Sequence, residues 1–269
     1  MQRLTRRQMM ASSAGGLLAA GLWPGWLGAK DTETKPFRFI VVNDLHVIDE
    51  KCQPWFDRVV TSMTSQTSAV EFVAVVGDLC EDGTAVQLDQ AKAILKSFKV
   101  PVHTVPGNHD YLSMTDRSVY DRLFPKQLNY RFDHAGWQFV ALDTTEGTKW
   151  EKVTAGKPTL DWLAAEIPKL DKSKPTTLLT HFPLGEGVKM RLANADAVLD
   201  HFKPLNLRGV FNGHYHAFTE KKVGTTIVTT NRCCSHARNN HDGTKPKGYF
   251  LCETKDGSVA REFVEVKPG

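Results

Sequence analysis

The sequence predicts an α/β fold built around a parallel sheet. Apolar strand-like runs alternate with helical stretches along the first part of the chain. The length of 269 residues suits one large α/β domain with a sizeable core, and no internal repeat or low-complexity tract divides it. Several apolar runs end in polar, glycine-containing loops, and ligands of open α/β sheets bind at the carboxyl ends of strands.

The first elements form a strand–helix–strand–helix–strand unit. Strands are expected at 37–42, 72–76 and 102–105, with helices at 55–66 and 85–98 between them. Such connections within one sheet give parallel strands with right-handed crossovers.

The remaining elements continue this pattern and add a hairpin. After residue 218, short strands and turns dominate the sequence. The other expected elements are a short helix at 117–123, a hairpin at 129–142 with its turn at 134–136, a helix at 159–170, and strands at 176–180 and 209–211.

Charge and composition argue against a general nucleic-acid binder. The formal net charge is +4, with 34 basic and 30 acidic residues. Residues 1–29 hold three arginines and no acid, so removing them leaves 31 basic residues against 30 acidic ones. A nearly neutral chain requires no basic face, and no specific nucleic acid is expected as a partner.

The N-terminus resembles a bacterial twin-arginine export signal. Arg6 and Arg7 precede the mild apolar run ASSAGGLLAAGLW, and Met9 stands where Phe or Leu is usual. The expected organisation is a signal segment at 1–29, a linker at 30–36 and one domain at 37–269. This predicts passage through the twin-arginine translocase to the periplasm or medium. An uncleaved leader acting as a membrane anchor and a fortuitous arginine pair are the alternatives, and the cleavage site is not identified.

Side chains typical of metal ligands follow five of the predicted strands. Carboxylate, imidazole and amide groups at successive strand ends suit a pair of divalent metals, which can stabilise both the attacking and the departing oxygen of a phosphoryl displacement. A mixed nitrogen and oxygen ligand set suits Mn, Fe, Zn or Co. The five blocks are Asp44-Leu45-His46, Gly77-Asp78, Gly107-Asn108-His109-Asp110, His181 and Gly213-His214-Tyr215-His216.

The order and spacing of these blocks resemble the calcineurin-like metallophosphoesterases. The resemblance is to the branch with GNHD and a terminal GHxH, which is similar to class III cyclic nucleotide phosphodiesterases, and it covers roughly residues 37–266. It implies a four-layer α/β sandwich of two central mixed β-sheets flanked by helices. It also implies hydrolysis of a phosphoester by a metal-bridging hydroxide. Little length remains for a cap domain, so an open crevice is expected.

The resemblance also assigns roles to individual residues. Asp78 is the expected bridging carboxylate. Asp44, His46 and His216 are assigned to the first metal, and Asn108, His181 and His214 to the second. Because His214 and His216 alternate along the chain, they would face opposite ways on a regular strand. An irregular strand end is therefore expected, which Gly213 permits.

The catalytic and substrate-binding residues are predicted less directly. His109 is expected to protonate the leaving alkoxide or to stabilise the phosphoryl oxygens. Asp110 either orients His109 or caps the following helix. The candidate substrate contacts are Asn108, His109, Tyr215, His236 and Arg238. The alternatives are a packing role for Tyr215 and a solvated loop at residues 231–243.

Cysteine content leaves the redox state open. Five cysteines leave at least one unpaired in a monomer, and in an oxidising compartment one or two disulfides are possible. Cys80 is expected to be a packing residue rather than a ligand. The five are Cys52, Cys80, Cys233, Cys234 and Cys252.

The favoured function is an exported, metal-dependent phosphodiesterase. Glu81 stands where purple acid phosphatases have a tyrosine, and the GDxxDRG pattern of protein phosphatases is replaced by GDLCEDG. Both differences point toward small or extended phosphoesters. The alternatives are a broad phosphomonoesterase, a non-catalytic scaffold, and a lipid or nucleotide-sugar hydrolase at a membrane face, which an exposed apolar rim would favour.

Overall fold

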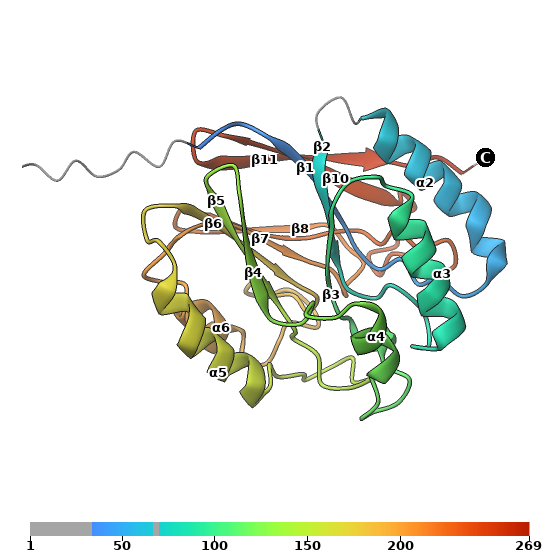
Figure 1. Cartoon of the computed structure of the whole chain (residues 1–269), viewed down its shortest axis with the longest axis horizontal. Helices are drawn as coiled ribbons and strands as arrows, with labels where there is room; N and C mark the ends of the chain where they lie inside the picture. Colours follow the sequence, from blue (N-terminus) through green and yellow to red (C-terminus); the bar gives the residue numbers. More distant parts are fainter. Residues whose placement is uncertain (1–33, 67–69, 269) are drawn as a thin grey trace, which may run out of the picture. The chain divides into compact units, whose positions relative to one another are not determined.

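Two β-sheets face each other at the centre of the fold (Figure 1). The computed structural model describes residues 34–66 and 70–268. The first sheet has the strand order β11-β10-β1-β2-β3, and the second has the order β4-β5-β6-β7-β9-β8. The strands are β1 (Arg38–Val42), β2 (Val70–Val76), β3 (Val102–Val105), β4 (Tyr130–His134), β5 (Trp137–Leu142), β6 (Pro175–Thr180), β7 (Asn206–Asn212), β8 (Thr219–Val223), β9 (Thr226–Thr230), β10 (Gly248–Lys255) and β11 (Ser258–Glu265).

Both sheets are mixed. Strands β1, β2 and β3 run parallel, as do β5, β6, β7 and β9. Antiparallel strands complete the sheets: β10 pairs with β1, β11 pairs with β10, and β4 and β8 lie at the edges of the second sheet. The parallel strands of each sheet therefore end at a common edge, where loops from different parts of the chain can meet.

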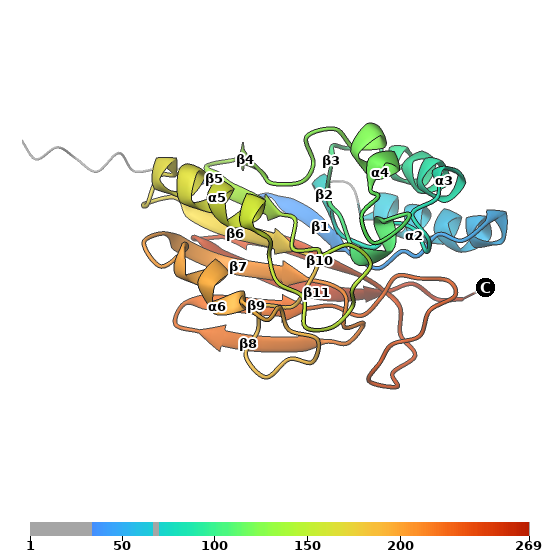
Figure 2. The ribbon, with the colours of Figure 1, turned by 90° about the horizontal axis from the view of Figure 1, so that it is seen from below.

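Helices cover the outer face of each sheet, as Figure 2 shows for α5 and α6 beside the second sheet. Local signals explain where two of them begin: Pro54 occupies the first turn of α2, and the Thr84 hydroxyl caps α3 by accepting from the Gln87 N–H at 3.4 Å. The helices are α2 (Gln53–Ser65), α3 (Ala85–Lys96), α4 (Ser118–Leu123), α5 (Lys157–Glu166) and α6 (Ala195–Asp200), with short 3-10 helices η1 (Glu50–Cys52), η2 (Asn108–Asp110) and η3 (Ile167–Lys169).

The side-chain alternation of the central strands builds three apolar layers. In β1, Phe39 and Val41 pack between the two sheets, whereas Ile40 and Val42 pack under α2 and α3. A separate apolar cluster joins β5, β6 and β7 to α5 and α6. Because successive strand residues point to opposite faces, a strand buried on both sides is apolar throughout. The four-layer sandwich predicted from the sequence is confirmed.

Most expected elements are present near their predicted positions, and the differences are local. The sequence did not predict α6, and residues after 218 form the long strands β10 and β11 as well as short ones. The expected signal segment and residues 30–33 of the expected linker lie outside the described residues. Within the described part of the chain, no helix is long and apolar enough to cross a membrane.

The structure describes a cysteine state that the sequence left open. The sequence allowed one or two disulfides, but all five cysteines are buried and free. Cys80 is fully buried, with its sulfur 3.7 Å from an oxygen of Asp110, as expected for a packing residue.

Candidate metal centre

The five predicted ligand blocks meet where the carboxyl ends of the parallel strands converge. Asp44 follows β1, Asp78 follows β2, Asn108 follows β3, His181 follows β6 and His214 follows β7. Backbone hydrogen bonds join the loops within each sheet. In the first sheet the N–H of Asp44 donates to the Gly77 carbonyl at 3.0 Å, and in the second the N–H of Gly213 donates to the His181 carbonyl at 2.9 Å.

Five of the candidate ligands have left-handed backbone conformations, which non-glycine residues rarely adopt. Such residues cluster at functional sites, where the surrounding structure holds them in place. The irregular strand ends expected from the His-x-His and Asp-x-His spacings are therefore made by the ligands themselves. The φ angles are 53° at Asp44, 46° at His46, 53° at Asp78, 66° at His214 and 47° at His216.

Gly213 has a different role from the one predicted. Gly213 itself does not have a positive φ. A Cβ atom at this position would lie 2.8 Å from Oδ2 of Asp44 and 3.0 Å from the carbonyl oxygen of Val76. The glycine is therefore needed for the close approach of the β7 loop to Asp44, not for an unusual backbone angle.

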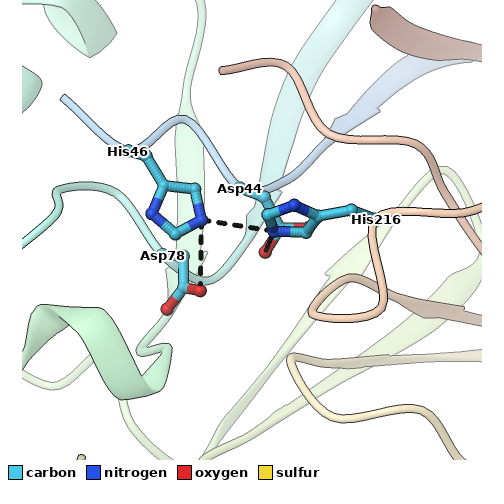
Figure 3. A group of neighbouring side chains, drawn as sticks. All are labelled: Asp44, His46, Asp78 and His216. Carbon is cyan, nitrogen blue, oxygen red and sulfur yellow. Dashed lines mark hydrogen bonds and ion pairs between the residues drawn. The ribbon is translucent and has the colours of Figure 1, made fainter. Parts of the chain in front are cut away.

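The first group of candidate ligands is Asp44, His46, Asp78 and His216, whose ligand atoms all lie within 4.8 Å of one another. Nε2 of His46 lies 3.2 Å from Nε2 of His216 and 3.5 Å from Oδ2 of Asp78. Nε2 of His216 lies 3.4 Å from Oδ1 of Asp44. Figure 3 shows the two rings turned toward each other, with the two carboxylates beside them. All four side chains are buried.

The second group shares Asp78 with the first. Asp78, His181 and His214 again place ligand atoms within 4.8 Å of one another. Nε2 of His181 lies 3.3 Å from Oδ2 of Asp78 and 3.3 Å from Oδ1 of Asn108. The same carboxylate oxygen thus approaches a histidine of each group. This is the arrangement that a bridging carboxylate requires.

The histidine tautomers fit metal ligation. In three of the rings, the nitrogen that faces away from the centre lies against a backbone carbonyl: Nδ1 of His181 at Val76 (3.0 Å), Nε2 of His214 at Trp150 (2.8 Å) and Nδ1 of His216 at Asn239 (3.2 Å). A carbonyl can only accept, so each of these nitrogens carries a proton. The opposite nitrogen is then free to bind a metal, as is usual for metal-ligating histidines.

The electrostatics of the metal-free centre follow from burial and from its two carboxylates. Burial disfavours a charged Asp78, but His181 outweighs this and holds the pKa of Asp78 well below its usual value. Burial likewise disfavours a charged His216, yet Asp44 raises the pKa of His216 to about 11. Asp78 raises the pKa of His181 to about 9 despite its burial. Without metals, protonated imidazoles therefore balance the buried carboxylates.

Glu81 connects two of the site histidines, a role that the sequence did not reveal. Its Oε2 lies 2.9 Å from Nδ1 of His46, and its backbone oxygen lies 2.7 Å from Nδ1 of His109. The Arg238 guanidinium pairs with both carboxylate oxygens. Burial would raise the pKa of Glu81, but His46 and Arg238 lower it to about 2. The only sequence signal was that Glu81 replaces the tyrosine of purple acid phosphatases.

His46, Glu81 and His109 form a further cluster whose ligand atoms lie within 4.8 Å of one another. A cation already balances this cluster, because the Arg238 guanidinium binds the Glu81 carboxylate. His109 lies at the edge of the crevice, with its ring centroid 4.7 Å from that of His46. Its backbone N–H also donates to Oδ1 of Asp78 at 2.9 Å. His109 is therefore fixed beside both groups of candidate ligands.

Asp110 does not take the orienting role considered for it. Its Oδ1 accepts from the N–H groups of Leu79 (2.8 Å) and Cys80 (3.1 Å), and its Oδ2 accepts from the N–H of Gly107 at 2.8 Å. These bonds tie the loop after β2 to the loop after β3 and cap η2. The His109 ring is instead held by the backbone oxygen of Glu81.

A crevice of about 510 Å³ opens over the two groups, and only part of the predicted substrate set lines it. Arg238 lines it together with Asn108 and His109, and so does His241, whose ring stacks on His216 with centroids 4.8 Å apart. The described residues that line the crevice include neither Tyr215 nor His236. Tyr215 borders a separate surface hollow, and His236 is exposed.

Comparisons with known proteins agree with this geometry. A family model described as calcineurin-like phosphoesterase matches residues 37–218. A probable cyclic nucleotide phosphodiesterase of Fibrobacter succinogenes is 27% identical over 206 residues, covering 69% of this chain and 75% of the relative. A 3′,5′-cyclic-nucleotide phosphodiesterase of Nostoc sp. is 24% identical over 199 residues, covering 68% and 73%. The solved structure of a dimetal phosphatase from Danio rerio aligns with a TM-score of 0.60 at 17% identity, covering 82% and 93%. The matched stretch 37–218 contains every candidate ligand.

Proposed function

Because the chain belongs to the calcineurin-like phosphoesterase family, we propose that this metal-dependent phosphoric ester hydrolase acts on phosphodiesters at the centre that Asp78 bridges. One observation carries the proposal. Oδ2 of Asp78 lies 3.5 Å from Nε2 of His46 and 3.3 Å from Nε2 of His181, which belong to different ligand groups. One buried carboxylate between two sets of inward-facing imidazoles suits a pair of divalent metals, with Mn, Fe and Zn as the candidates.

The bound metals would supply positive charge for the phosphoryl oxygens and acidify a water molecule. The chain's own contribution begins with His109. Its Nδ1 donates to the Glu81 carbonyl, which fixes the ring and leaves Nε2 for the crevice. With a second proton on Nε2, this ring can protonate the departing alkoxide. Asn108 and His109 both line the crevice beside Asp78, so they can also contact the phosphoryl group as it reacts.

Two observations favour diesters over monoesters. The relatives from Fibrobacter succinogenes and Nostoc sp. both bear names of cyclic nucleotide phosphodiesterases. In addition, the crevice is an open hollow formed by loops at the strand ends. A second ester group can therefore extend from the phosphorus along the crevice instead of meeting a closed wall.

A substrate panel on the metal-loaded enzyme tests this proposal. It comprises a 3′,5′-cyclic nucleotide, bis(p-nitrophenyl) phosphate and p-nitrophenyl phosphate. The ratio of kcat/KM for the diester to that for the matching monoester should exceed one, and chelation should abolish turnover. A strong monoester preference would instead identify a phosphomonoesterase. A preparation with two metals per chain that hydrolyses none of these esters would indicate a non-catalytic scaffold.

We further propose that the protein is exported in its folded state, with residues 1–29 as the signal and 37–269 as the domain. The support is the Arg6-Arg7 pair before a mild apolar run. The ligands extend along the sequence from Asp44 to His216, so metals can bind as a pair only after folding. Changing both arginines to lysine should strand active enzyme in the cytoplasm with its leader uncut. Unchanged periplasmic activity would show that the arginine pair is incidental.

A further inference from the structure

We infer that Leu112 and Trp150 form a binding wall for a planar ring on the substrate. This inference rests on the proposed phosphodiesterase function and adds the residues that select the organic part of the ester. Both residues line the crevice, and both are about half exposed, at 49% and 54%. Large apolar side chains exposed next to polar groups often mark a binding site.

The wall stands out among the described residues. Seven large apolar side chains are exposed among the described residues. Leu112 and Met114 lie on the loop between η2 and α4, Trp150 lies on the loop between β5 and α5, and these two loops contact each other. The Thr148 hydroxyl lies 3.3 Å from the Met114 sulfur. Gly147 also approaches the Met114 backbone so closely that a Cβ atom would lie 2.1 Å from its carbonyl oxygen.

Hydrogen bonds hold the two loops together before any ligand arrives. The Tyr111 hydroxyl bonds to the Thr145 hydroxyl at 2.8 Å and accepts from Nη1 of Arg117 at 2.8 Å. The same guanidinium pairs with Asp143, whose carboxylate accepts from the Thr145 N–H at 3.0 Å. A wall that is ordered in advance binds a ligand without a large cost of immobilisation.

The wall is also fixed relative to the metal centre. The backbone oxygen of Trp150 accepts from Nε2 of His214, a candidate ligand, at 2.8 Å. Leu112 follows His109 by three residues and lies on the same loop. A phosphate at the metal centre therefore places its organic group within reach of the apolar wall.

The polar lining of the crevice indicates which organic group fits. Glu81, Asp82, Arg238 and His241 line it together with Leu112 and Trp150 and offer charges and hydrogen-bonding groups. A heteroaromatic ring has an apolar face for the Trp150 indole and polar edges for these residues. An alkyl chain would offer no hydrogen-bonding partner to these groups. We therefore assign the wall to a planar heteroaromatic ring, since stacking on an aromatic side chain depends little on which ring is bound.

The test compares two cyclic phosphodiesters that differ only in this ring. One is a nucleoside 3′,5′-cyclic phosphate, and the other is the ribose 3′,5′-cyclic phosphate with a methoxy group in place of the base. Wild-type enzyme should prefer the ring-bearing ester in kcat/KM by about 5- to 150-fold, the range expected for one stacked base. Trp150→Ala should reduce that ratio toward one with little change for the ring-free ester. Trp150→Phe should retain most of the preference for the ring-bearing ester, and Leu112→Ala should lose part of that preference.

Two controls separate binding from structure. Val223→Ala removes an equally exposed apolar side chain at the end of β8, outside the crevice, and should leave the ratio unchanged. Metal content should stay at the wild-type value in Trp150→Ala, because the backbone carbonyl that holds His214 remains.

Three results would overturn the assignment: equal wild-type rates on the two esters, equal losses on both in Trp150→Ala, or a Trp150-dependent preference for a long-chain alkyl diester over the nucleotide. Failure of the proposed function has a different signature, because metal-loaded wild-type enzyme would then hydrolyse neither cyclic ester nor bis(p-nitrophenyl) phosphate.

Discussion

Removing the Glu81 carboxylate should weaken one metal site and spare the other. Oε2 of Glu81 lies 2.9 Å from Nδ1 of His46, on the side of the ring opposite the nitrogen that faces Asp78. The carboxylate thus fixes the His46 tautomer and directs Nε2 toward the first group of ligands. No comparable contact joins Glu81 to His181 or His214 among the described residues. Glu81→Ala should therefore act on the first metal alone.

The expected magnitude follows from the contact that is lost. Losing a hydrogen-bond partner of a metal-bound histidine typically costs about 10- to 100-fold in affinity. Loss of the ion pair between Glu81 and Arg238 contributes less to the effect of Glu81→Ala. The Arg238 side chain is 41% exposed, and exposed ion pairs contribute about 0–1 kcal/mol. We expect the first-site affinity to fall by about 10- to 100-fold.

Calorimetric titration of metal into metal-free protein measures both binding events. Glu81→Ala should shift one event and leave the other in place. Glu81→Gln should restore much of the affinity, since an amide oxygen can still accept from Nδ1 of His46. Glu71→Ala is a matched control, because it removes a histidine–glutamate contact of 2.6 Å to His134 outside the site. Equal weakening of both events, or no change in either, would refute the orienting role.

Three further outcomes are expected. Asp78→Ala should reduce the metal content from two per chain toward zero, measured by elemental analysis, because both groups lose their shared ligand. His109→Ala should keep its metals but lose about 10²–10⁴-fold in kcat on alkyl esters, and less on nitrophenyl esters, whose leaving group needs little protonation. Metal affinity should rise with pH, by about tenfold per unit for each proton displaced, because the pKa values of His181 (about 9) and His216 (about 11) are raised and their protons must leave. A pH-independent affinity between pH 6.5 and 9 would contradict these protonation states.

Local patterns predicted most of the fold because each strand carries its own signal. The apolar run at 37–42 is buried almost throughout, and the run at 102–105 ends at Pro106 and Gly107. Each strand can therefore be located from its own residues, without knowing which strand pairs with it. Strand pairing is different. Arg38 of β1 lies opposite Glu253 of β10, more than two hundred residues later. Nothing in either segment specifies this neighbour, so the sequence does not predict the antiparallel pairing of β10 with β1.

At the site, the sequence likewise predicts which residues are ligands but not how the loops arrange them. The order and spacing of the five blocks, and their resemblance to the calcineurin-like phosphoesterases, identify the seven residues that the structure brings together. The left-handed φ angles of Asp44 and His216 follow from contacts between loops, which a linear motif does not contain. The sequence shows Glu81 only as a replaced tyrosine, although its carboxylate contacts His46 and Arg238. The position of Tyr215 between two ligands suggests a substrate contact, yet Tyr215 borders a different hollow.

Hydrogen bonds hold the metal centre in place before metals bind, and they stabilise a fold that contains buried carboxylates, closely spaced imidazoles and left-handed backbone angles. Nε2 of His46 and Nε2 of His216 lie 3.2 Å apart beside buried carboxylates, and neighbouring backbone angles are left-handed. Each of these features raises the free energy of the metal-free fold. Asp110 counteracts them by accepting from three backbone N–H groups of two loops, and carbonyl partners fix the rings of His181 and His216. Since the ligands are already oriented, little of the metal-binding free energy is consumed in ordering the loops, and bound metals would take the place of the protons that balance the carboxylates in the metal-free fold.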